Sequence, residues 1–288
     1  DLYHGPNFKM HTTGRSGGIV TIHDLWLARH PEYSRKLLGQ AGSSRRAIAT
    51  ANRARRVVTV SEFSAREIEA LYGIPRERVV VIHNGVTEEF SPVQDEQGMA
   101  VLRARWAIPS AGFILFVGGA DPRKNHRVFL QAVAQSRSQL GGRAILLVGD
   151  AEHPQGSYLA TARSLGLEQD VRCTGRLNRE DLCRLYSYAE VFVFPSLYEG
   201  FGMPVLEAMA CGAPTITSST SSLPEVAGDA ALLVNPEDAE ALGAAMVKVL
   251  SEQALRQQLR DRGFERARLF TWQRAALRTS ALYRELCA

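Results

Sequence analysis

Two glutamates, Glu199 and Glu207, enclose a segment that contains two glycines, Gly200 and Gly202. A glycine has no Cβ, so the backbone can approach a ligand closely there. The segment follows an apolar run, Val191–Phe194, typical of a buried strand, and opens a predicted helix whose first N–H groups attract anions. Carboxylates accept hydrogen bonds from the hydroxyls of a sugar or ribose. The pattern therefore suits a nucleotide sugar, with a diphosphate between two polyols.

The spacing alone leaves another interpretation open, because strand–loop–helix units with surface glutamates occur throughout α/β proteins. The full string from Phe194 to Pro214, FPSLYEGFGMPVLEAMACGAP, resembles the signature of retaining glycosyltransferases of family 4, and its E-x7-E pattern is complete. The resemblance covers nearly the whole chain. It implies the α/β GT-B fold, with two Rossmann-like, doubly wound domains. It also implies transfer of a sugar from a nucleoside diphosphate donor with retained anomeric configuration.

The resemblance gives each part of this segment a role. Glu199 would hold the donor sugar, and Glu207 would hold the ribose. The amides that would bind the diphosphate belong to Gly200, Phe201, Gly202 and Met203. No metal and no other cofactor is expected, because helix N–H groups and basic side chains would take the metal's part. The implied chemistry is attack by an acceptor hydroxyl on the donor sugar, from the same face that the diphosphate leaves. The donor phosphate would take up the proton of that hydroxyl.

A second loop follows the predicted strand Phe113–Val117 and carries Arg123 and Lys124. A basic pair at a loop tip is commonly just solvated, but cations there can also neutralise a diphosphate leaving group. The same element in family 4 carries an arginine and a lysine that bind the donor phosphates. Lys124 fits that pattern directly. The family's arginine would fall on Gly119, so Arg123 would supply the second charge, and Gly119 is expected at the donor site.

Two more candidates follow predicted strands in the first third of the chain. His23 closes Ile19–Ile22, and the string Thr21–Leu25 resembles the family's His-Asp/Glu element, which implies sugar positioning or charge stabilisation by His23. The residues alone also allow a structural histidine beside an Asp24 that caps the next turn. Asn84, in an Asn-Gly turn signal after a further strand, is another donor-site candidate.

The Pro-Arg-Lys-Asn string at Lys124 resembles mannosyltransferase-like branches of the family, so GDP-mannose is the expected donor, with UDP-glucose and similar donors left open. The acceptor would be a glycan or a lipid-linked molecule. Two alternatives remain. The chain can be a non-catalytic nucleotide-sugar-binding fragment or subunit that needs a partner for its acceptor site. A GT-B phosphorylase or epimerase is the other, although no pyridoxal-type lysine motif is recognisable.

The 288 residues carry a formal net charge of +4, and 45% of them are hydrophobic, as in ordinary globular proteins. Residues 1–92 hold 13 Lys/Arg against 9 Asp/Glu, whereas residues 93–288 hold 21 of each. We expect a solvated basic helix or a surface for anionic lipid, formed by Arg45, Arg46, Arg53, Arg55 and Arg56. Nucleic acid is not expected, because no aromatic residues interleave with these arginines. The four cysteines lack metal-binding spacing. We expect a cytoplasmic protein, with or without peripheral membrane contact.

The chain alternates β-branched runs with amphipathic stretches, which is typical of parallel α/β sheets. We expect a partial, acceptor-side domain over 1–92, a linker over 93–99, a donor-binding domain over 100–271, and a last helix over 272–288 that packs toward the first domain. Relatives carry further β-α units before the first segment, so we expect a truncated first domain. Its small sheet would lack cover, and it would either self-associate or be locally unstable.

Overall fold

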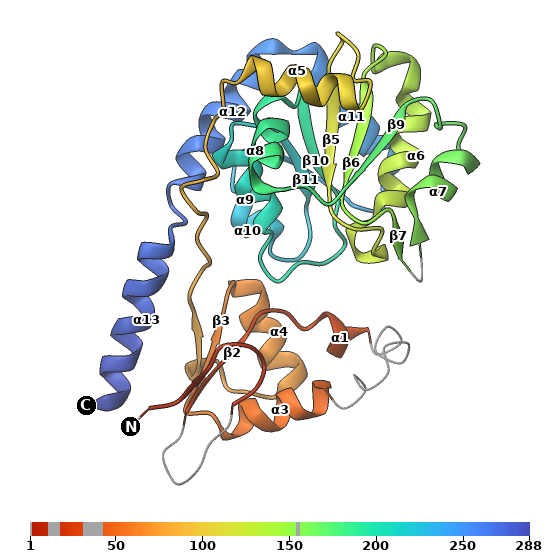
Figure 1. Ribbon diagram of the computed structural model, residues 1–288. Coiled ribbons are helices and arrows are strands. Elements are labelled where there is room, and N and C mark those ends of the chain that lie inside the picture. The colour runs from red at the N-terminus through yellow and green to blue at the C-terminus, as the bar shows by residue number, and fades with distance from the viewer. Residues whose placement is uncertain (1, 11–17, 31–42, 154–155) are drawn as a thin grey trace. The chain divides into compact units, whose positions relative to one another are not determined.

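The computed structural model describes residues 2–10, 18–30, 43–153 and 156–288, without the side chains of residues 43–45. The chain divides into two compact units (Figure 1). Unit 1 contains Asp1–Gly85, Glu199–Phe201 and Phe270–Ala288. Unit 2 contains Val86–Tyr198 and Gly202–Leu269. The division after residue 85 differs from the expected linker over 93–99, a stretch in which a helix already begins at residue 96.

Unit 1 is built on a parallel sheet whose strands neighbour one another in chain order. The strands are β1 (His4–Gly5), β2 (Ile19–Ile22), β3 (Arg56–Thr59) and β4 (Val79–Val81). The β-branched runs of the first third, Ile19–Ile22, Val57–Val60 and Val79–Ile82, predict β2, β3 and β4. The two-residue β1 was not expected, because so short a strand has no sequence pattern of its own. It pairs with β2 through His4 and Gly5.

The helices of unit 1 come from both ends of the chain. They are α1 (Trp26–Arg29), α3 (Ser43–Arg53), α4 (Glu62–Tyr72) and α13 (Trp272–Cys287), with a 3-10 turn, η2 (Arg76–Arg78). The Ser61 hydroxyl accepts the Ser64 N–H at 3.0 Å and so caps the start of α4. Gly73 ends α4 in the left-handed conformation, with φ at 64°. The sequence pattern predicts a helix from about Ser34 to Ala54, and α3 shows it from residue 43 onward, because residues 31–42 lie outside the described part.

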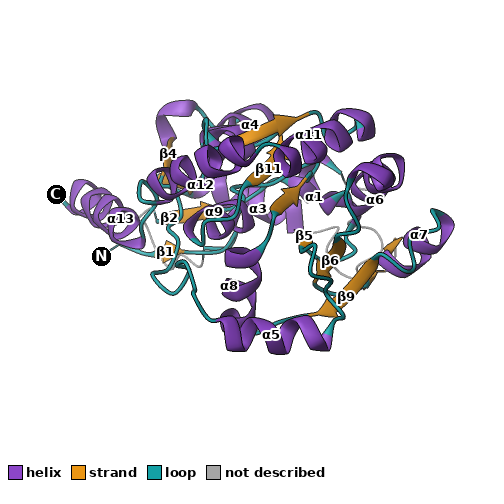
Figure 2. Ribbon diagram, turned by 90° about the horizontal axis from the view of Figure 1, so that it is seen from above, coloured by secondary structure: helices purple, strands orange, loops and turns teal. Residues whose placement is uncertain are grey.

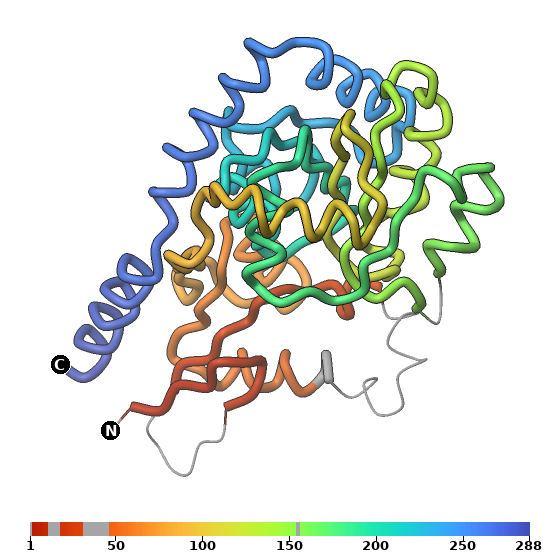
Figure 3. The backbone as a smooth tube through the Cα atoms, turned by 45° about the horizontal axis from the view of Figure 1, so that its top comes forward, coloured from red at the N-terminus to blue at the C-terminus, as the bar shows by residue number. Residues whose placement is uncertain are grey.

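Helices cover both faces of the unit 1 sheet, because successive strand residues point to opposite sides. Val20 and Val57 belong to the core cluster that contains the buried residues of α3 and α4. Ile19 and Val58 belong to a second cluster, which α13 closes with buried leucines at positions 282 and 286. Figure 3 shows α13 (blue) ending near the first residues (red). The expectation that the faces lack cover is therefore wrong for the described residues.

Unit 2 is a parallel sheet of six strands with helices on both faces (Figure 2). In spatial order the strands are β12 (Ala231–Val234), β11 (Thr215–Ser218), β10 (Val191–Phe194), β5 (Phe113–Val117), β6 (Ala144–Val148) and β9 (Val171–Gly175). A separate two-stranded ribbon pairs β7 (Glu152–His153) with β8 (Gly156–Ser157). The order runs outward in both directions from β5 and β10. Ligands of doubly wound sheets bind at the carboxyl ends of the strands at such a switch point.

The helices of unit 2 follow their strands in regular succession. They are α5 (Glu96–Arg105), α6 (His126–Ser136), α7 (Tyr158–Ser164), α8 (Arg179–Tyr188), α9 (Met203–Ala210), α10 (Leu223–Ala227), α11 (Ala239–Ser251) and α12 (Gln253–Ala267), with 3-10 turns η3 (Pro122–Lys124) and η4 (Arg137–Gln139). On one face of the sheet, α6 and α11 pack against strand residues such as Ile114 and Val193. On the other face, the Tyr186 ring of α8 meets the Phe192 ring edge-on at 5.3 Å. The doubly wound architecture expected for the second domain is confirmed.

Candidate functional site

Lys124 lies at the switch point of unit 2, at the end of the loop that follows β5. Its ammonium Nζ is 5.0 Å from the centre of the Phe194 ring, at the end of β10. Its side chain runs along Gly118, where an added Cβ would meet Lys124 Cγ at 3.1 Å. The lysine is therefore positioned between the carboxyl ends of β5 and β10, where a cation can neutralise a phosphate.

The η3 turn that carries Arg123 and Lys124 is fixed mainly through its backbone. The Arg123 carbonyl accepts the Leu197 N–H at 2.9 Å and the Ser196 hydroxyl at 3.0 Å. Asn125 is buried, has a φ of 60°, and donates to the carbonyls of Pro195 and Pro236 at 3.0 and 2.6 Å. The turn is thus tied to the loop that follows β10 and to residue 236, beyond β12.

The Arg123 side chain lies beside a carboxylate and is only partly exposed. Its Nε lies 3.7 Å from Asp121 Oδ2, and 21% of the side chain is exposed. The carboxylate reduces the positive charge that Arg123 adds to the loop. At Gly119, the expected place of the family's arginine, an added Cβ would meet nothing closer than 3.9 Å. Packing does not require a glycine there, so the position leaves open space beside the loop.

The helix start predicted after Gly202 is present in unit 2. Gly202 has a φ of 111° and caps α9, whose first two residues are Met203 and Pro204. The proline therefore occupies the second helical position, where its missing N–H is harmless. The positive φ explains why a glycine stands at residue 202. Gly202 and Met203 accordingly bring their amides to the first turn of a helix, as anion binding requires.

Glu207 lies in the second turn of α9 and is half-buried. The hydroxyl of Tyr186, a fully buried side chain, donates to Glu207 Oε2 at 3.3 Å. Burial raises the pKa of the Glu207 carboxyl, against the opposing effects of the Tyr186 hydrogen bond and of the charges on Arg179 and Lys124. The carboxylate is thus oriented by one hydrogen bond and is poorly solvated. Both properties favour a hydroxyl-bearing ligand that supplies further hydrogen bonds.

The first part of the E-x7-E segment belongs to unit 1, where it packs on the ends of β2 and β3. The Gly200 carbonyl accepts the Ser61 hydroxyl at 2.7 Å and the Ser64 hydroxyl at 3.2 Å. An added Cβ at Gly200 would lie 2.0 Å from the carbonyl oxygen of His23. Any other residue would clash with backbone there, so Gly200 is required by packing. The structure thus brings the segment against His23, as the two resemblances together suggest.

His23 is half-buried and hydrogen-bonded within unit 1. Its Nε2 donates to the Pro6 carbonyl at 2.9 Å. Asp24 Oδ1 accepts the Trp26 N–H at 3.0 Å, while the N-cap position of α1 is held by Leu25. Glu199 is 7% exposed. His23 is thus fixed by a hydrogen bond, and Glu199 is buried.

Asn84 is half-buried and makes no hydrogen bond with any residue that the structure describes. Its neighbour Gly85 does not serve the expected turn. An added Cβ at Gly85 would lie 2.0 Å from the backbone nitrogen of Trp272, so this glycine permits a close approach by the start of α13. Beside it, the His83 ring lies 6.1 Å from Phe201 and 5.4 Å from Phe270. Phe201 is therefore a packing residue in unit 1, whatever its amide binds.

The expected basic helix is shorter than the arginine cluster. Only Arg45, Arg46 and Arg53 belong to α3. Arg55 donates to the Leu286 carbonyl at 2.9 Å, and Arg56 lies 3.3 Å from the Glu285 carboxylate, so both are bound to α13. The prediction that all five arginines share one helix is wrong, because the strand β3 begins at Arg56. Arg46 and Arg53 remain exposed.

Two kinds of feature are absent from the described part of the chain. No group of three or more His, Cys, Asp and Glu side chains there is arranged to hold a metal ion. Among those same residues, no helix has both the length and the apolar character to span a membrane.

Sequence reasoning missed three of the groups that position this site. Tyr186 orients Glu207 from α8, but nothing in its local sequence marks a functional role. Asn125 ties three loops together, and its place directly after Lys124 was the available signal. Ser61 was recognisable as a helix cap, yet its hydrogen bond to Gly200 joins residues 139 positions apart and leaves no local pattern.

Comparisons with known proteins agree with this geometry. Residues 101–266 match the family described as glycosyl transferases group 1, and residues 1–90 match glycosyltransferase family 4. O-antigen chain mannosyltransferase B of Escherichia coli is 33% identical over 99% of this chain and 74% of its own length. A serotype-specific mannosyltransferase, WbdA of Escherichia coli, is 34% identical over 80% of this chain, which spans only 28% of that relative.

Solved structures agree as well. Sucrose-phosphate synthase from Thermosynechococcus elongatus is 29% identical and superposes with a TM-score of 0.75, over 93% of this chain and 67% of the other. The matches to both halves, the parallel sheets flanked by helices and the complete E-x7-E segment lead to one conclusion. The chain belongs to the glycosyltransferases of family 4 and has their GT-B fold.

Proposed function

We propose that this glycosyltransferase transfers a mannosyl group from GDP-mannose to a glycan or lipid-linked acceptor, with retention of the anomeric configuration. The observation that carries the donor-binding part is the arrangement of Lys124, the start of α9 and Glu207 in unit 2. A cation, a helix start and a buried carboxylate lie at the carboxyl ends of the strands around one switch point. Together they suit a diphosphate flanked by a ribose.

In this proposal the residues of unit 2 bind the nucleotide. Lys124 neutralises the charge that develops on the departing diphosphate, with Arg123 adding to it as far as Asp121 allows. The amides of Gly202 and Met203 donate to phosphate oxygens. The Glu207 carboxylate accepts hydrogen bonds from the ribose hydroxyls. No metal is needed in this scheme, because these groups supply the positive charge and the N–H donors.

The residues of unit 1 act on the transferred sugar. Glu199 accepts hydrogen bonds from the sugar hydroxyls, and His23 stabilises charge near the anomeric carbon. The amides of Gly200 and Phe201 and the side chain of Asn84 complete the donor contacts. Such contacts lower the barrier because they stabilise the charge that develops in an oxocarbenium-like transition state.

Mannose is proposed because the two Escherichia coli relatives reported above are named mannosyltransferases. The acceptor is proposed as a glycan or lipid-linked molecule on the same basis, since one of them is named for the O-antigen chain. The exposed arginines of α3, Arg46 and Arg53, would then face an anionic membrane surface.

A donor panel tests the proposed reaction. The chain is incubated with GDP-mannose, UDP-glucose or ADP-glucose and a mannose-terminated acceptor, and the product is analysed by proton NMR. We expect transfer from GDP-mannose alone, with an α-linked product. Transfer from a uridine donor would refute the donor assignment. Nucleotide binding without any transfer would favour the non-catalytic, donor-binding alternative.

Variants in unit 1 test the division of roles. Glu199→Gln and His23→Ala should lower turnover at least about 100-fold, since both act in the transition state, while GDP affinity stays within about twofold. Glu77→Gln, at an exposed position of the same unit, is the control and should leave both quantities unchanged. Equal losses of affinity and turnover would assign Glu199 and His23 to nucleotide binding or to folding.

A further inference from the structure

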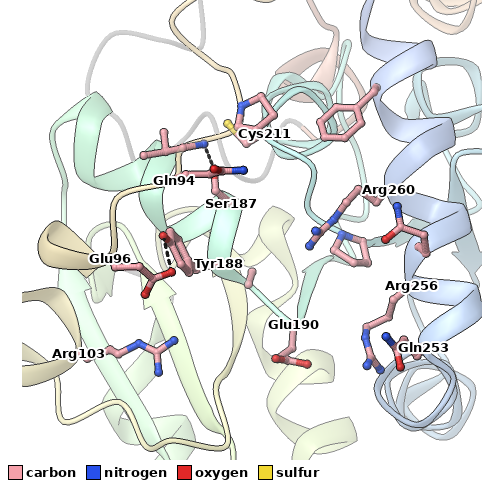
Figure 4. Close-up of a pocket in the computed structure, with 16 residues that line it drawn as sticks. Gln94, Glu96, Arg103, Ser187, Tyr188, Glu190, Cys211, Gln253, Arg256 and Arg260 are labelled. Carbon is pink, nitrogen blue, oxygen red and sulfur yellow. Dashed lines mark hydrogen bonds between the residues drawn. The ribbon is translucent and has the colours of Figure 1, made fainter. Parts of the chain in front are cut away.

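Unit 2 contains a cavity of about 820 Å³ at the amino ends of its strands, away from the carboxyl ends that carry Lys124 (Figure 4). Glu190 and Pro214, which immediately precede β10 and β11, form part of its lining. Helices α5, α8 and α12 contribute further residues, and the others come from the segment before α5 and from the positions directly after α8 and α9. Small-molecule sites typically measure about 300–1,000 Å³, so the cavity has the size of a ligand site. None of its lining residues is a candidate donor-binding residue.

Two arginines from α12 reach into this cavity (Figure 4). Arg256 and Arg260 are one helical turn apart and therefore lie on one face. Arg256 Nη1 donates to the carbonyls of Val249 and Leu250 at 2.9 and 2.6 Å. Arg260 Nε donates to the Gly212 carbonyl at 2.9 Å. Each guanidinium is thus fixed through one nitrogen, and the other N–H groups make no hydrogen bond within the described part of the chain.

Arg103, from α5, lines the same cavity. The Arg103 guanidinium makes no hydrogen bond or ion pair with the described residues, although the residue is only partly exposed. Three guanidinium groups therefore line one cavity without an internal partner for most of their N–H groups. Guanidinium groups fixed in advance bind phosphate oxygens at low entropic cost, because little side-chain freedom remains to be lost.

The other polar groups of the cavity suit hydroxyls. Glu96 Oε1 accepts the Tyr188 hydroxyl at 3.0 Å, which orients this carboxylate. Glu190 Oε2 lies 3.9 Å from Arg143 Nη2, too far for a hydrogen bond, so the carboxylate retains acceptor capacity. The side-chain amides of Gln253 and Gln257 also line the cavity and can donate or accept.

We propose that this cavity is a binding site for a small phosphorylated sugar, separate from the donor site. Its phosphate binds between Arg256 and Arg260, with Arg103 adding charge. Its hydroxyls donate to Glu190 and to the glutamine amides. With three arginines against two glutamates, the cavity favours an anion, while the carboxylates select a ligand that also carries hydrogen-bond donors. The inference does not depend on the identity of the nucleotide sugar.

Calorimetry on the whole chain tests the proposal with mannose 1-phosphate, mannose 6-phosphate, mannose and inorganic phosphate. Saturating GDP is present, so that phosphate cannot bind where Lys124 lies. We expect saturable binding of at least one sugar phosphate, weaker binding of inorganic phosphate, and none of mannose. No saturable binding of either sugar phosphate up to about 10 mM, a concentration at which even weak sites fill, would overturn the proposal.

Matched variants locate the binding. Arg103→Gln should weaken sugar phosphate binding about tenfold, the effect of a lost charge-assisted hydrogen bond, without loss of stability. Arg260→Gln should weaken it further. Arg105→Gln is the control, since Arg105 lies on the same helix over the Trp106 ring and outside the cavity. Binding that persists in both Arg103→Gln and Arg260→Gln, or that disappears in Lys124→Ala, would place the ligand elsewhere and refute the assignment.

Discussion

The two units complete their cores in different ways. Unit 2 buries both faces of its six-stranded sheet with helices that lie between its own strands or directly after them. Unit 1 buries one face of a four-stranded sheet with α13, which follows its last strand, β4, by 190 residues. Closing the long segment between β4 and α13 costs chain entropy, which the contacts of α13 must offset. The comparison indicates that unit 1 depends on the end of the chain, whereas unit 2 does not.

The largest effect is expected at the point where α13 meets the rest of unit 1. Gly85→Ala would place a Cβ 2.0 Å from the Trp272 nitrogen, a backbone atom that can move only if α13 moves. We expect a loss of more than about 3 kcal/mol in the stability of unit 1, since clash and lost burial combine. Hydrogen exchange should accelerate in Ile19–Ile22 and Arg56–Thr59 but not in Phe113–Val117.

Gly73→Ala is the matched control for this substitution. Nothing lies within 4 Å of an added Cβ at residue 73, and only the positive φ opposes it. It should cost about 1 kcal/mol through backbone strain alone. If the two variants were equally stable, or if exchange rose equally in both units, the dependence of unit 1 on α13 would be disproved.

A histidine gives unit 2 a pH dependence of its own. His126 is 1% exposed, and neither ring nitrogen has a hydrogen-bond partner among the described residues. Burial, with smaller effects of nearby charges, lowers the pKa of His126 from 6.5 to about 4. As the pH falls, the unfolded chain is protonated first. The part of the stability of unit 2 that depends on a neutral His126 is therefore fully present above pH 6.5 and is lost progressively toward pH 4.

The lost stability should amount to about 3 kcal/mol, from the energy equivalent of the pKa change. His126→Phe, which retains an aromatic ring against Tyr158, should remove most of this acid sensitivity from unit 2. Urea denaturation at pH 7 and pH 4.5, followed in each unit by hydrogen exchange, measures it. An unchanged acid sensitivity in His126→Phe would show that other groups govern the pH response of unit 2.

The smallest of the three effects concerns Glu207, where binding and stability should oppose each other. The raised pKa means that ionisation of Glu207 destabilises the ligand-free fold, so its stability falls as pH rises from the unfolded value through the folded one. Glu207→Gln removes this cost and should leave the free protein as stable at pH 7 or more so. Nucleotide binding should weaken by about 1–3 kcal/mol.

Thermal melts and GDP titrations of Glu207→Gln measure the two quantities. Glu240→Gln, an exposed residue of α11, is the control and should change neither. A variant that loses stability together with affinity would show that Glu207 supports the fold of unit 2 rather than the ligand.

The regular parts of both units could be predicted because their sequence patterns are local. Phe113–Val117 and Ala144–Val148 are continuous apolar runs with the bounds of the observed strands, as expected where parallel strands are buried on both faces. The E-x7-E segment was recognisable from its residues alone. The start of α9 after Gly202 could be predicted because the strand, the loop and the helix follow one another locally, whereas the positive φ of Gly202 was not predicted.

Features that depend on distant contacts could not be predicted. The Asn-Gly pair at residues 84 and 85 indicates a turn, but the role of Gly85 is to admit the backbone at Trp272, far along the chain. The cover that α13 gives to the unit 1 sheet depends on its Leu282 and Leu286, which no pattern in the first third reveals. Tyr186 shows the same limit within the site, since its role depends on where α8 packs.

Nucleotide binding by the whole chain tests the central claim, that unit 2 carries the donor site of a glycosyltransferase. Calorimetry compares GDP binding by the unmodified chain, by Lys124→Ala and by the control Arg105→Ala. We expect GDP binding that weakens by about 1.5–3 kcal/mol in Lys124→Ala, the cost of a lost charge-assisted contact, and that is unchanged in Arg105→Ala. GDP affinity equal in all three proteins, or no binding of GDP, UDP or ADP at millimolar concentration, would contradict the account.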